Sequence, residues 1–221
     1  MNVNTLQSAE AAVPPAPRLL RSTLTSPFGR KVRMAMVILG LGDQIEVEPA
    51  DTRSETDTLR EQNPLGKMPC LLLDSGTAIY DSRVIIEFLD QWSGRNRLIP
   101  QDAHDRAQVL TCATLADGIA DAALLMVYEG RFRDPEQKSE VWLSHQRGKV
   151  ERGLTAISHA LPNPKTTDIA SISLACALGY LDWREPVEWR SRFPKLVEWL
   201  KAFAAAEPAF DATRRPDEAA S

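Results

Sequence analysis

Three short segments of this chain carry residue types that favour anion binding at the ends of regular elements. They are residues 25–33 (Thr-Ser-Pro-Phe-Gly-Arg-Lys-Val-Arg), residues 63–69 (Asn-Pro-Leu-Gly-Lys-Met-Pro) and residues 80–82 (Tyr-Asp-Ser). The first predicts a hydroxyl at the start of a helix, the second a proline at the start of a strand, and the third an Asp-Ser pair at the start of another helix. Helix N-termini attract anions through their unpaired N–H groups. Together the segments indicate a site for a small anionic thiol.

Ser26 is the residue of the first segment best placed to stabilise such an anion. Serine is a favoured N-cap, Pro27 suits the first helical turn, and the apolar run that follows ends at Gly40. A thiol of pKa ~8.5 needs a shift of about 2 units, or ~2.7 kcal/mol, to be mostly ionised at pH 7. A hydrogen bond to the anion (roughly 1.5–3 kcal/mol) and the helix dipole (roughly 0.3–1 kcal/mol) supply it. An isolated Ser-Pro pair is far more often only a cap, and Thr25 is the alternative if the helix begins one residue earlier.

Four segments of the sequence resemble one known family. Residues 26–33 resemble its first strand–helix junction, residues 63–69 its approach to a cis-proline, and residues 80–89 its third helix. Residues 168–170 followed by 177–182 resemble the core helix of its second domain. The family is the cytosolic-type glutathione transferases, of the bacterial kind with serine rather than tyrosine at the active position.

This resemblance implies a thioredoxin-like α/β domain followed by an all-α domain, and a reaction in which the glutathione thiolate attacks a small hydrophobic electrophile, as in detoxification. Ser26 is then the catalytic residue. A cis Met68–Pro69 bond would turn the Met68 backbone toward the cysteinyl backbone of glutathione, and Lys67 would meet its glycyl carboxylate. Asp81 and Ser82 would hold its γ-glutamyl end. The implied glutathione-binding residues are Lys67, Met68, Pro69, Asp81 and Ser82.

The electrophile pocket and the reaction itself leave alternatives open. Phe28, Tyr128 and Arg131 are expected to line that pocket, with Arg131 meeting an acidic substrate. An ordinary helix end is the other explanation for Tyr128 and Arg131, and a solvated loop residue for Lys67. Two other functions are a non-catalytic glutathione-fold binding module and a glutathione-dependent disulfide reductase, although a reductase normally has a cysteine at the Ser26 position. The electrophile cannot be read from the sequence.

Composition excludes several other classes of protein. The chain has 221 residues and a formal net charge of -4 without a basic stripe, which argues against nucleic acid as a partner. It shows no signal-peptide pattern and no apolar run near the ~20 residues of a membrane span, so a cytoplasmic protein is expected. The 3 cysteines are widely spaced, which favours a reducing compartment over a disulfide framework. The histidines have no metal-ligand spacing, so no metal is expected. A homodimer is expected from the resemblance alone.

Periodicity divides the chain into two halves. We expect a disordered tail at 1–17, the glutathione-binding domain at 18–97, a linker at 98–104, a helical domain at 105–207 and a C-terminal tail at 208–221. The first half alternates strand and helix patterns, whereas strand signals vanish after Gln101. Asp168 begins the most apolar helix and is interpreted as a cap with a folding role. The family places Ser or Thr three residues earlier as its capping partner; here that position is Lys165, and Thr166 is the expected substitute.

Overall fold

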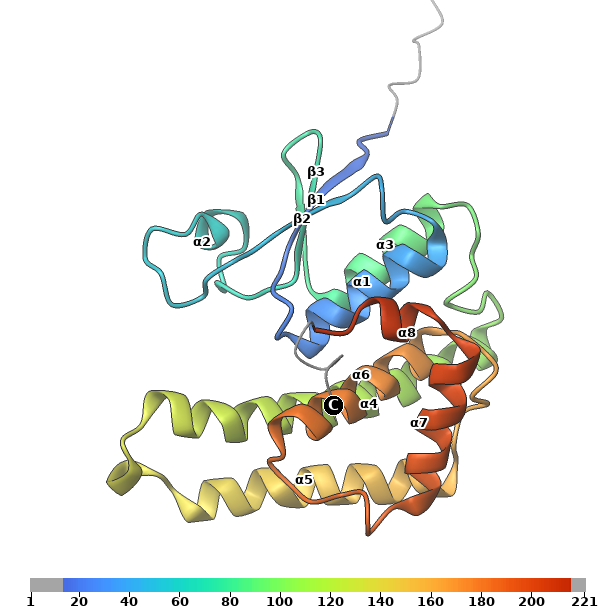
Figure 1. The fold of residues 1–221 in the computed structure, drawn as a ribbon. Coiled ribbons are helices and arrows are strands. Elements are labelled where there is room, and N and C mark those ends of the chain that lie inside the picture. Colours follow the sequence, from blue (N-terminus) through green and yellow to red (C-terminus); the bar gives the residue numbers. More distant parts are fainter. Residues whose placement is uncertain (1–13, 216–221) are drawn as a thin grey trace, which may run out of the picture.

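A computed structural model describes residues 14–215 as an α/β domain followed by a helical domain (Figure 1). The α/β domain contains β1 (Pro17–Arg21), α1 (Pro27–Leu39), β2 (Glu46–Glu48), α2 (Leu59–Gln62), β3 (Cys70–Leu73), β4 (Ala78–Ile79) and α3 (Ser82–Trp92). The helical domain contains α4 (Ala103–Phe132), the 3₁₀ turn η1 (Pro135–Gln137), α5 (Glu140–His159), α6 (Ile169–Arg184), α7 (Pro194–Ala206) and α8 (Ala209–Ala212). The predicted order of an α/β half and a helical half is confirmed.

The sheet brings the three segments that are predicted to bind an anion to the same end of its strands. Its order is β2-β1-β3-β4, with β2 parallel to β1 and the other neighbours antiparallel. Arg21, the last residue of β1, lies opposite Cys70, the first residue of β3, and Ile79 at the end of β4 lies opposite Leu71. The end of β1, the start of β3 and the end of β4 therefore lie at the same end of the sheet's strands. Helices α1 and α3 both begin beyond this end.

Element ends differ from the prediction at a few places. Pro17 belongs to β1 rather than to the tail, because Asp74 binds Ala16 through its side chain (3.1 Å) and its backbone N–H (2.9 Å). Helix α4 begins inside the predicted linker, and α8 lies inside the predicted C-terminal tail. Helix α5 begins at Glu140, because Ser139 caps it by accepting from the Trp142 N–H at 3.2 Å. Tail residues 1–13 and 216–221 lie outside the described residues.

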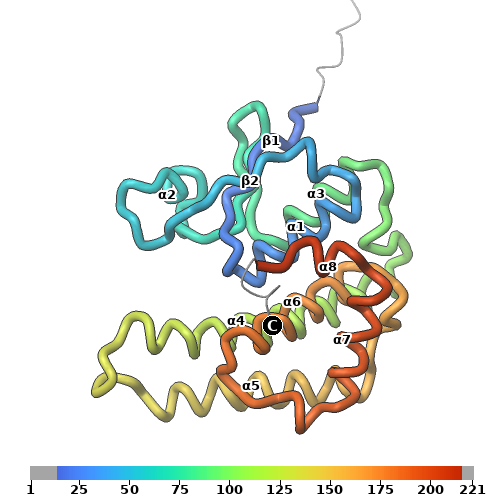
Figure 2. The backbone as a smooth tube through the Cα atoms, in the orientation of Figure 1, coloured from blue at the N-terminus to red at the C-terminus, as the bar shows by residue number. Residues whose placement is uncertain are grey.

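The two domains share one hydrophobic core. Helices α1 and α3 pack on each other, α1 also packs on α6 and α8, and α4 packs on both α5 and α6. In the backbone view the helical domain lies on the α1 and α3 side of the sheet, with α8 next to α1 (Figure 2). Helix α3 turns Ile85 and Ile86 into this core, whereas the neighbouring Val84 is 51% exposed. Helix α4 is long and apolar enough to span a membrane by length and composition, but its apolar side is packed against α5 and α6, as in a core helix.

Helix α6 is the buried centre of the helical domain, and Asp168 caps it. The Asp168 carboxylate accepts from the Ser171 N–H at 2.8 Å, and the Ser171 hydroxyl oxygen accepts from the Asp168 N–H at 3.0 Å. The reciprocal pair is a capping box. Its partner is thus Ser171, downstream of Asp168, and the expectation that Thr166 substitutes was wrong.

Asp168→Ala should lower the free energy of unfolding by about 0.5–2 kcal/mol, because the first turn of α6 loses its acceptor. Glutathione affinity should persist in the folded fraction, since Asp168 lies far in sequence from the segments 25–33, 63–69 and 80–82 that are predicted to bind glutathione. Denaturant unfolding and calorimetric titration check the two statements. Thr166→Ala is the control, because Thr166 is exposed and outside the capping box. A variant of wild-type stability that no longer binds glutathione would contradict the structural role.

Candidate functional site

Ser26 lies at the start of α1, as predicted. Its hydroxyl oxygen accepts a hydrogen bond from the Gly29 N–H at 3.1 Å, and Pro27 is the first helical residue. This cap uses the oxygen as acceptor, so the hydroxyl proton remains able to donate to an anion. Gly29 is required by close packing, because a Cβ there would lie 2.0 Å from the Ser22 hydroxyl oxygen. Thr25 is exposed and pairs its hydroxyl with that of Thr23 at 2.9 Å.

The segment before β3 lies against the start of α1. The Met68–Pro69 bond is cis, as the resemblance implied. The Thr23 hydroxyl donates to the Met68 sulfur at 3.3 Å, which links this segment to the residues before α1. Asn63 is buried and donates to the Lys67 carbonyl oxygen at 2.8 Å, so it shapes the loop from within. The Lys67 side chain is exposed.

Buried Arg21 holds the loop that leads into this segment. Its guanidinium donates to the Thr58 hydroxyl at 2.8 Å, the Gln62 amide oxygen at 2.9 Å and the Asp57 carboxylate at 2.9 Å. The carboxylate of Asp57 also accepts from the backbone N–H groups of Asp51 and Leu59. These hydrogen bonds and the Arg21 charge hold the pKa of Asp57 below its ordinary value, although burial opposes them. Arg21 therefore anchors α2 and the loop before Met68 to the end of β1.

Asp81 and Ser82 lie at the start of α3, as predicted. Asp81, not Ser82, is the N-cap, and its carboxylate accepts from the Arg83 N–H at 3.0 Å. Ser82 is the first helical residue and is 3% exposed. The Tyr80–Asp81 bond is also cis. Partial burial raises the pKa of Asp81, but the Arg83 N–H, the Arg83 guanidinium and Lys31 outweigh it and hold the pKa below its ordinary value. Asp81 therefore keeps its negative charge at neutral pH.

A buried ion pair that the sequence reasoning missed lies behind this helix end. The Lys31 ammonium donates to both carboxylate oxygens of Asp117, at 2.7 and 2.8 Å, and the Lys31 side chain is 1% exposed. The Arg83 Nε lies 3.8 Å from the same carboxylate. The chain of charges Lys31, Asp117, Arg83 and Asp81 thus joins α1, α4 and α3. The feature of the sequence that could have indicated this ion pair is a charged residue inside each of two apolar helices.

A narrow cavity of about 10 Å³ lies beside Ser26, between α1 and α6. Its lining residues are Leu24, Thr25, Ser26, Pro27, Arg30, Cys176, Gly179, Tyr180, Trp183 and Arg215. Burial raises the pKa of the Tyr180 hydroxyl, against the effect of Arg184. Arg30, Tyr180, Trp183 and Arg215 were not among the predicted site residues.

The residues predicted for the electrophile pocket lie around this cavity rather than in its lining. Phe28 packs against the shared core. Tyr128 packs its ring edge-on against Phe132, and the Arg131 guanidinium lies over the Tyr128 ring at 5.0 Å. Tyr128 and Arg131 are near enough to influence the pKa of Tyr180, which does line the cavity. None of the three predicted residues is in its lining.

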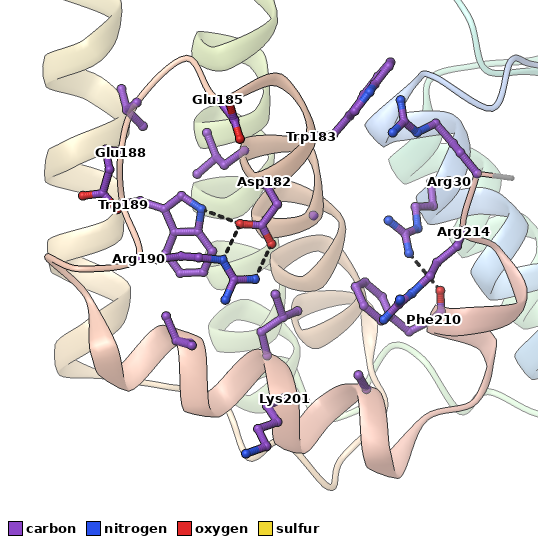
Figure 3. A pocket seen from close by; sticks show the side chains of 17 residues that line it. Arg30, Asp182, Trp183, Glu185, Glu188, Trp189, Arg190, Lys201, Phe210 and Arg214 are labelled. Carbon is purple, nitrogen blue, oxygen red and sulfur yellow. Dashed lines mark hydrogen bonds and ion pairs between the residues drawn. The ribbon is translucent and has the colours of Figure 1, made fainter. Parts of the chain in front are cut away.

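A larger groove of about 1040 Å³ adjoins this cavity, and Figure 3 shows its lining. It shares Arg30, Gly179, Trp183 and Arg215 with the cavity beside Ser26. Its outer part is held by Asp182, whose carboxylate accepts from the Trp189 indole N–H at 3.0 Å and the Arg190 guanidinium at 2.7 and 2.8 Å (Figure 3). Arg30 and Trp183 therefore line both spaces.

The cysteines are poor candidates for the reacting group. Burial raises the pKa of both Cys70 and Cys176 to about 11, and it also raises that of Cys112. Cys176 lines the cavity beside Ser26, but its thiol stays protonated at neutral pH. Among residues 14–215 no three His, Cys, Asp or Glu side chains gather as a possible metal site.

Comparisons with known proteins identify the family. The model of the glutathione S-transferase N-terminal domain matches residues 25–92. The chain is 34% identical over 200 residues to the "Uncharacterized GST-like protein YibF" of Escherichia coli (strain K12), covering 86% of this chain and 98% of that protein. The chain belongs to the glutathione transferase family.

Solved structures of the glutathione transferase family agree with the fold. A family member from Pseudomonas fluorescens Pf-5 with bound glutathione is 41% identical and superposes with a TM-score of 0.82, covering 90% of this chain and 98% of that one. A Pf-5 structure with bound S-(propanoic acid)-glutathione is 41% identical, with a TM-score of 0.79 and coverage of 90% and 99%. The expected thioredoxin-like domain followed by a helical domain is therefore confirmed.

Proposed function

We propose that this protein is a serine-type glutathione transferase that conjugates the glutathione thiolate to a small electrophile. The observation that carries the proposal is the Ser26 cap, whose oxygen accepts from the Gly29 N–H at 3.1 Å and leaves the hydroxyl proton to donate. A thiolate placed there would also meet the positive end of the α1 dipole. The thiolate is the nucleophile, so stabilising it at neutral pH raises the reaction rate.

Glutathione fits this end of the sheet as an extended tripeptide, next to the starts of α1 and α3. The backbone of Met68, next to the cis bond, pairs with its cysteinyl residue as a short ladder. The Asp81 carboxylate holds the γ-glutamyl ammonium group, the Ser82 hydroxyl and the free N–H groups of α3 hold its carboxylate, and exposed Lys67 reaches the glycyl carboxylate. Relatives support glutathione as the ligand, because one Pf-5 structure contains glutathione and the other contains S-(propanoic acid)-glutathione, a thioether of the kind that conjugation produces.

The reaction is a nucleophilic attack that needs no protein nucleophile. The sulfur forms a bond to the electrophilic carbon, and that carbon either releases a leaving group or passes its π electrons to the neighbouring atom. The protein contributes ionisation of the thiol and positioning of the two reactants. The raised pKa of Cys176 disfavours a disulfide reductase, since this thiol next to Ser26 is not a thiolate at neutral pH.

The ultraviolet absorbance of protein-bound glutathione against pH tests the proposal. We expect the bound thiol to titrate about 2 units below its free value of ~8.5, and a generic aryl halide to be turned over above the uncatalysed rate. A bound thiol with an unshifted pKa, together with no turnover, would contradict the transferase function. It would favour the alternative, a glutathione-binding module that works through protein partners.

Asp81→Ala and Ser82→Ala should weaken glutathione binding in the folded protein, and Asp81→Ala should also lower the free energy of unfolding by about 0.5–2 kcal/mol because it removes the cap of α3. Each removes a hydrogen bond to a charged group, which costs roughly 1.5–3 kcal/mol and raises Kd roughly 10- to 150-fold. Titration calorimetry measures the affinity, and Val84→Ala is a control because Val84 is an exposed neighbour on the same helix. Unchanged affinity in both variants would remove these residues from the site.

The cellular location and oligomeric state proposed for the enzyme follow from the family and the composition. We place it in the cytoplasm, where the 3 cysteines stay reduced, and as a homodimer. Glutathione and a small electrophile are its ligands, without nucleic acid, membrane or metal. Light scattering of the purified chain measures the oligomeric state directly.

A further inference from the structure

The side chain of buried Asn63 binds the backbone of the loop before β3 at two points. Asn63 is 2% exposed, and its side-chain amide nitrogen donates to the Lys67 carbonyl oxygen at 2.8 Å. The oxygen of the same amide accepts from the Leu65 N–H at 3.1 Å. Because a backbone N–H can only donate, the amide oxygen must face Leu65 and the amide nitrogen must face Lys67. The side chain of Asn63 therefore has one fixed orientation.

Helix α2 holds Asn63 in place from the other side. The Asn63 N–H donates to the Leu59 carbonyl oxygen at 2.7 Å, and the Leu59 side chain packs in a small second core with Cys70 and Leu72. Helix α2 lies on the opposite face of the sheet from α1 and α3 (Figure 1). The guanidinium of Arg21 binds the same helix to the end of β1. Asn63 is thus supported by packed elements and not only by the loop that it shapes.

The peptide unit between Lys67 and Met68 links Asn63 to the backbone group that faces a ligand. This unit is trans, since the cis bonds of the described residues precede Pro69 and Asp81. In a planar trans unit the carbonyl and the N–H point in opposite directions. The Lys67 carbonyl oxygen is turned inward to Asn63, so the Met68 N–H is turned away from Asn63. No hydrogen bond among residues 14–215 uses the Met68 N–H or the Met68 carbonyl oxygen.

We propose that Asn63 is a positioning residue for glutathione: by holding the Lys67 carbonyl oxygen, it aims the Met68 N–H at the carbonyl oxygen of the cysteinyl residue. This inference rests on the proposed function, in which the Met68 backbone pairs with that residue. Hydrogen bonds weaken steeply when the donor angle falls toward ~120°. A peptide unit that rotates freely would lose part of this bond and would have to be ordered when the ligand binds. Asn63 orders the unit before glutathione arrives.

Three ligands distinguish this role from a general effect on stability. Glutathione and γ-glutamylcysteine both carry an oxygen at the cysteinyl carbonyl position, whereas γ-glutamylcysteamine lacks that carbonyl and keeps the thiol and the γ-glutamyl group. Calorimetric titration of Asn63→Ala should show a loss of affinity for glutathione of roughly 3- to 10-fold, the scale of one hydrogen bond. The loss for γ-glutamylcysteine should be at least as large, and the affinity for γ-glutamylcysteamine should be unchanged. Leu65→Ala is the matched control, because Leu65 is 71% exposed and its N–H still binds Asn63.

Asn63→Asp repeats the test without leaving a cavity. Its carboxylate still accepts from the Leu65 N–H but has no proton to donate to the Lys67 carbonyl oxygen, so the same pattern of losses is expected. The stoichiometry of each titration gives the folded fraction, and the affinity is read from that fraction. Equal losses for all three ligands, or no loss for any of them, would overturn the positioning role and leave the transferase function standing. Losses confined to glutathione and γ-glutamylcysteine, in a protein whose wild type turns over no aryl halide, would keep the positioning role and overturn the transferase function.

Amide hydrogen exchange of the wild-type protein tests the same geometry without any variant. Exchange of the Met68 N–H should be faster in the free protein than in the complex with glutathione, because the bound cysteinyl carbonyl oxygen then accepts from it. At equal saturation, γ-glutamylcysteamine should slow this exchange less than glutathione does. Equal slowing by the two ligands, or a Met68 N–H that exchanges at the same rate with and without glutathione, would overturn the proposal.

Discussion

Ser26→Ala should cut turnover at neutral pH by roughly 10- to 100-fold, because the hydroxyl hydrogen bond to the thiolate corresponds to about 1–2 pKa units. The sign follows from the titration. Losing a donor to the anion raises the bound thiol pKa, so at a fixed neutral pH less of the bound glutathione is thiolate. The deficit should shrink as the pH rises past the new pKa. A pH profile of turnover, with the absorbance titration of bound thiol, measures both effects.

Glutathione affinity should survive in Ser26→Ala, since the Met68 backbone and the Asp81 and Ser82 side chains are unchanged. The variant also loses the cap of α1, so its free energy of unfolding should fall by about 0.5–2 kcal/mol. Thr25→Ala is the control, because Thr25 lines the same cavity and is not the cap. Loss of activity in Thr25→Ala but not in Ser26→Ala would mean that the hydroxyl next to the thiol was assigned to the wrong residue.

Features set by short-range chemistry could be predicted from the sequence. The Ser26 cap and the Gly40 end of α1 with its positive φ of 73° each depend on neighbouring residues. The α3 cap shows the limit of such reasoning. Asp81 and Ser82 are both good caps, and only the path of the chain after β4 places Asp81 at the cap and buries Ser82.

Features set by long-range packing could not be predicted. Arg30 meets the Phe210 carbonyl oxygen across 180 residues of sequence, and Arg215 meets the cavity beside Ser26 only because the end of the chain passes close to α1. Arg30 and Lys31 stand side by side in the sequence, yet Arg30 lines the cavity and Lys31 lies in the interface between domains. The residues of the helical half that line the cavity beside Ser26 are brought there by tertiary contacts, which the periodicity of the sequence does not reveal.

Asp117→Leu should lower the free energy of unfolding by about 3–5 kcal/mol, the usual cost of removing one partner of a buried ion pair. The Lys31 ammonium, whose side chain is 1% exposed, would be left in the interface between α1 and α4 without the carboxylate 2.7 Å away. The double substitution Lys31→Met with Asp117→Leu should recover most of that loss, since an apolar pair of similar volume replaces the ions. Denaturant unfolding of the wild type, both single variants and the double variant measures the coupling.

The double variant also separates stability from positioning. Asp117 lies 3.8 Å from Arg83, and the backbone N–H and guanidinium of Arg83 both bind Asp81. If Asp117 orients Arg83 and through it the carboxylate that meets glutathione, the double variant should regain stability and still bind glutathione more weakly than the wild type. Full recovery of both stability and affinity would mean that the ion pair joins the two domains and does not orient Arg83. An Asp117→Leu variant as stable as the wild type would contradict the buried pair itself, because the Lys31 ammonium left in this core has no other described carboxylate within salt-bridge distance.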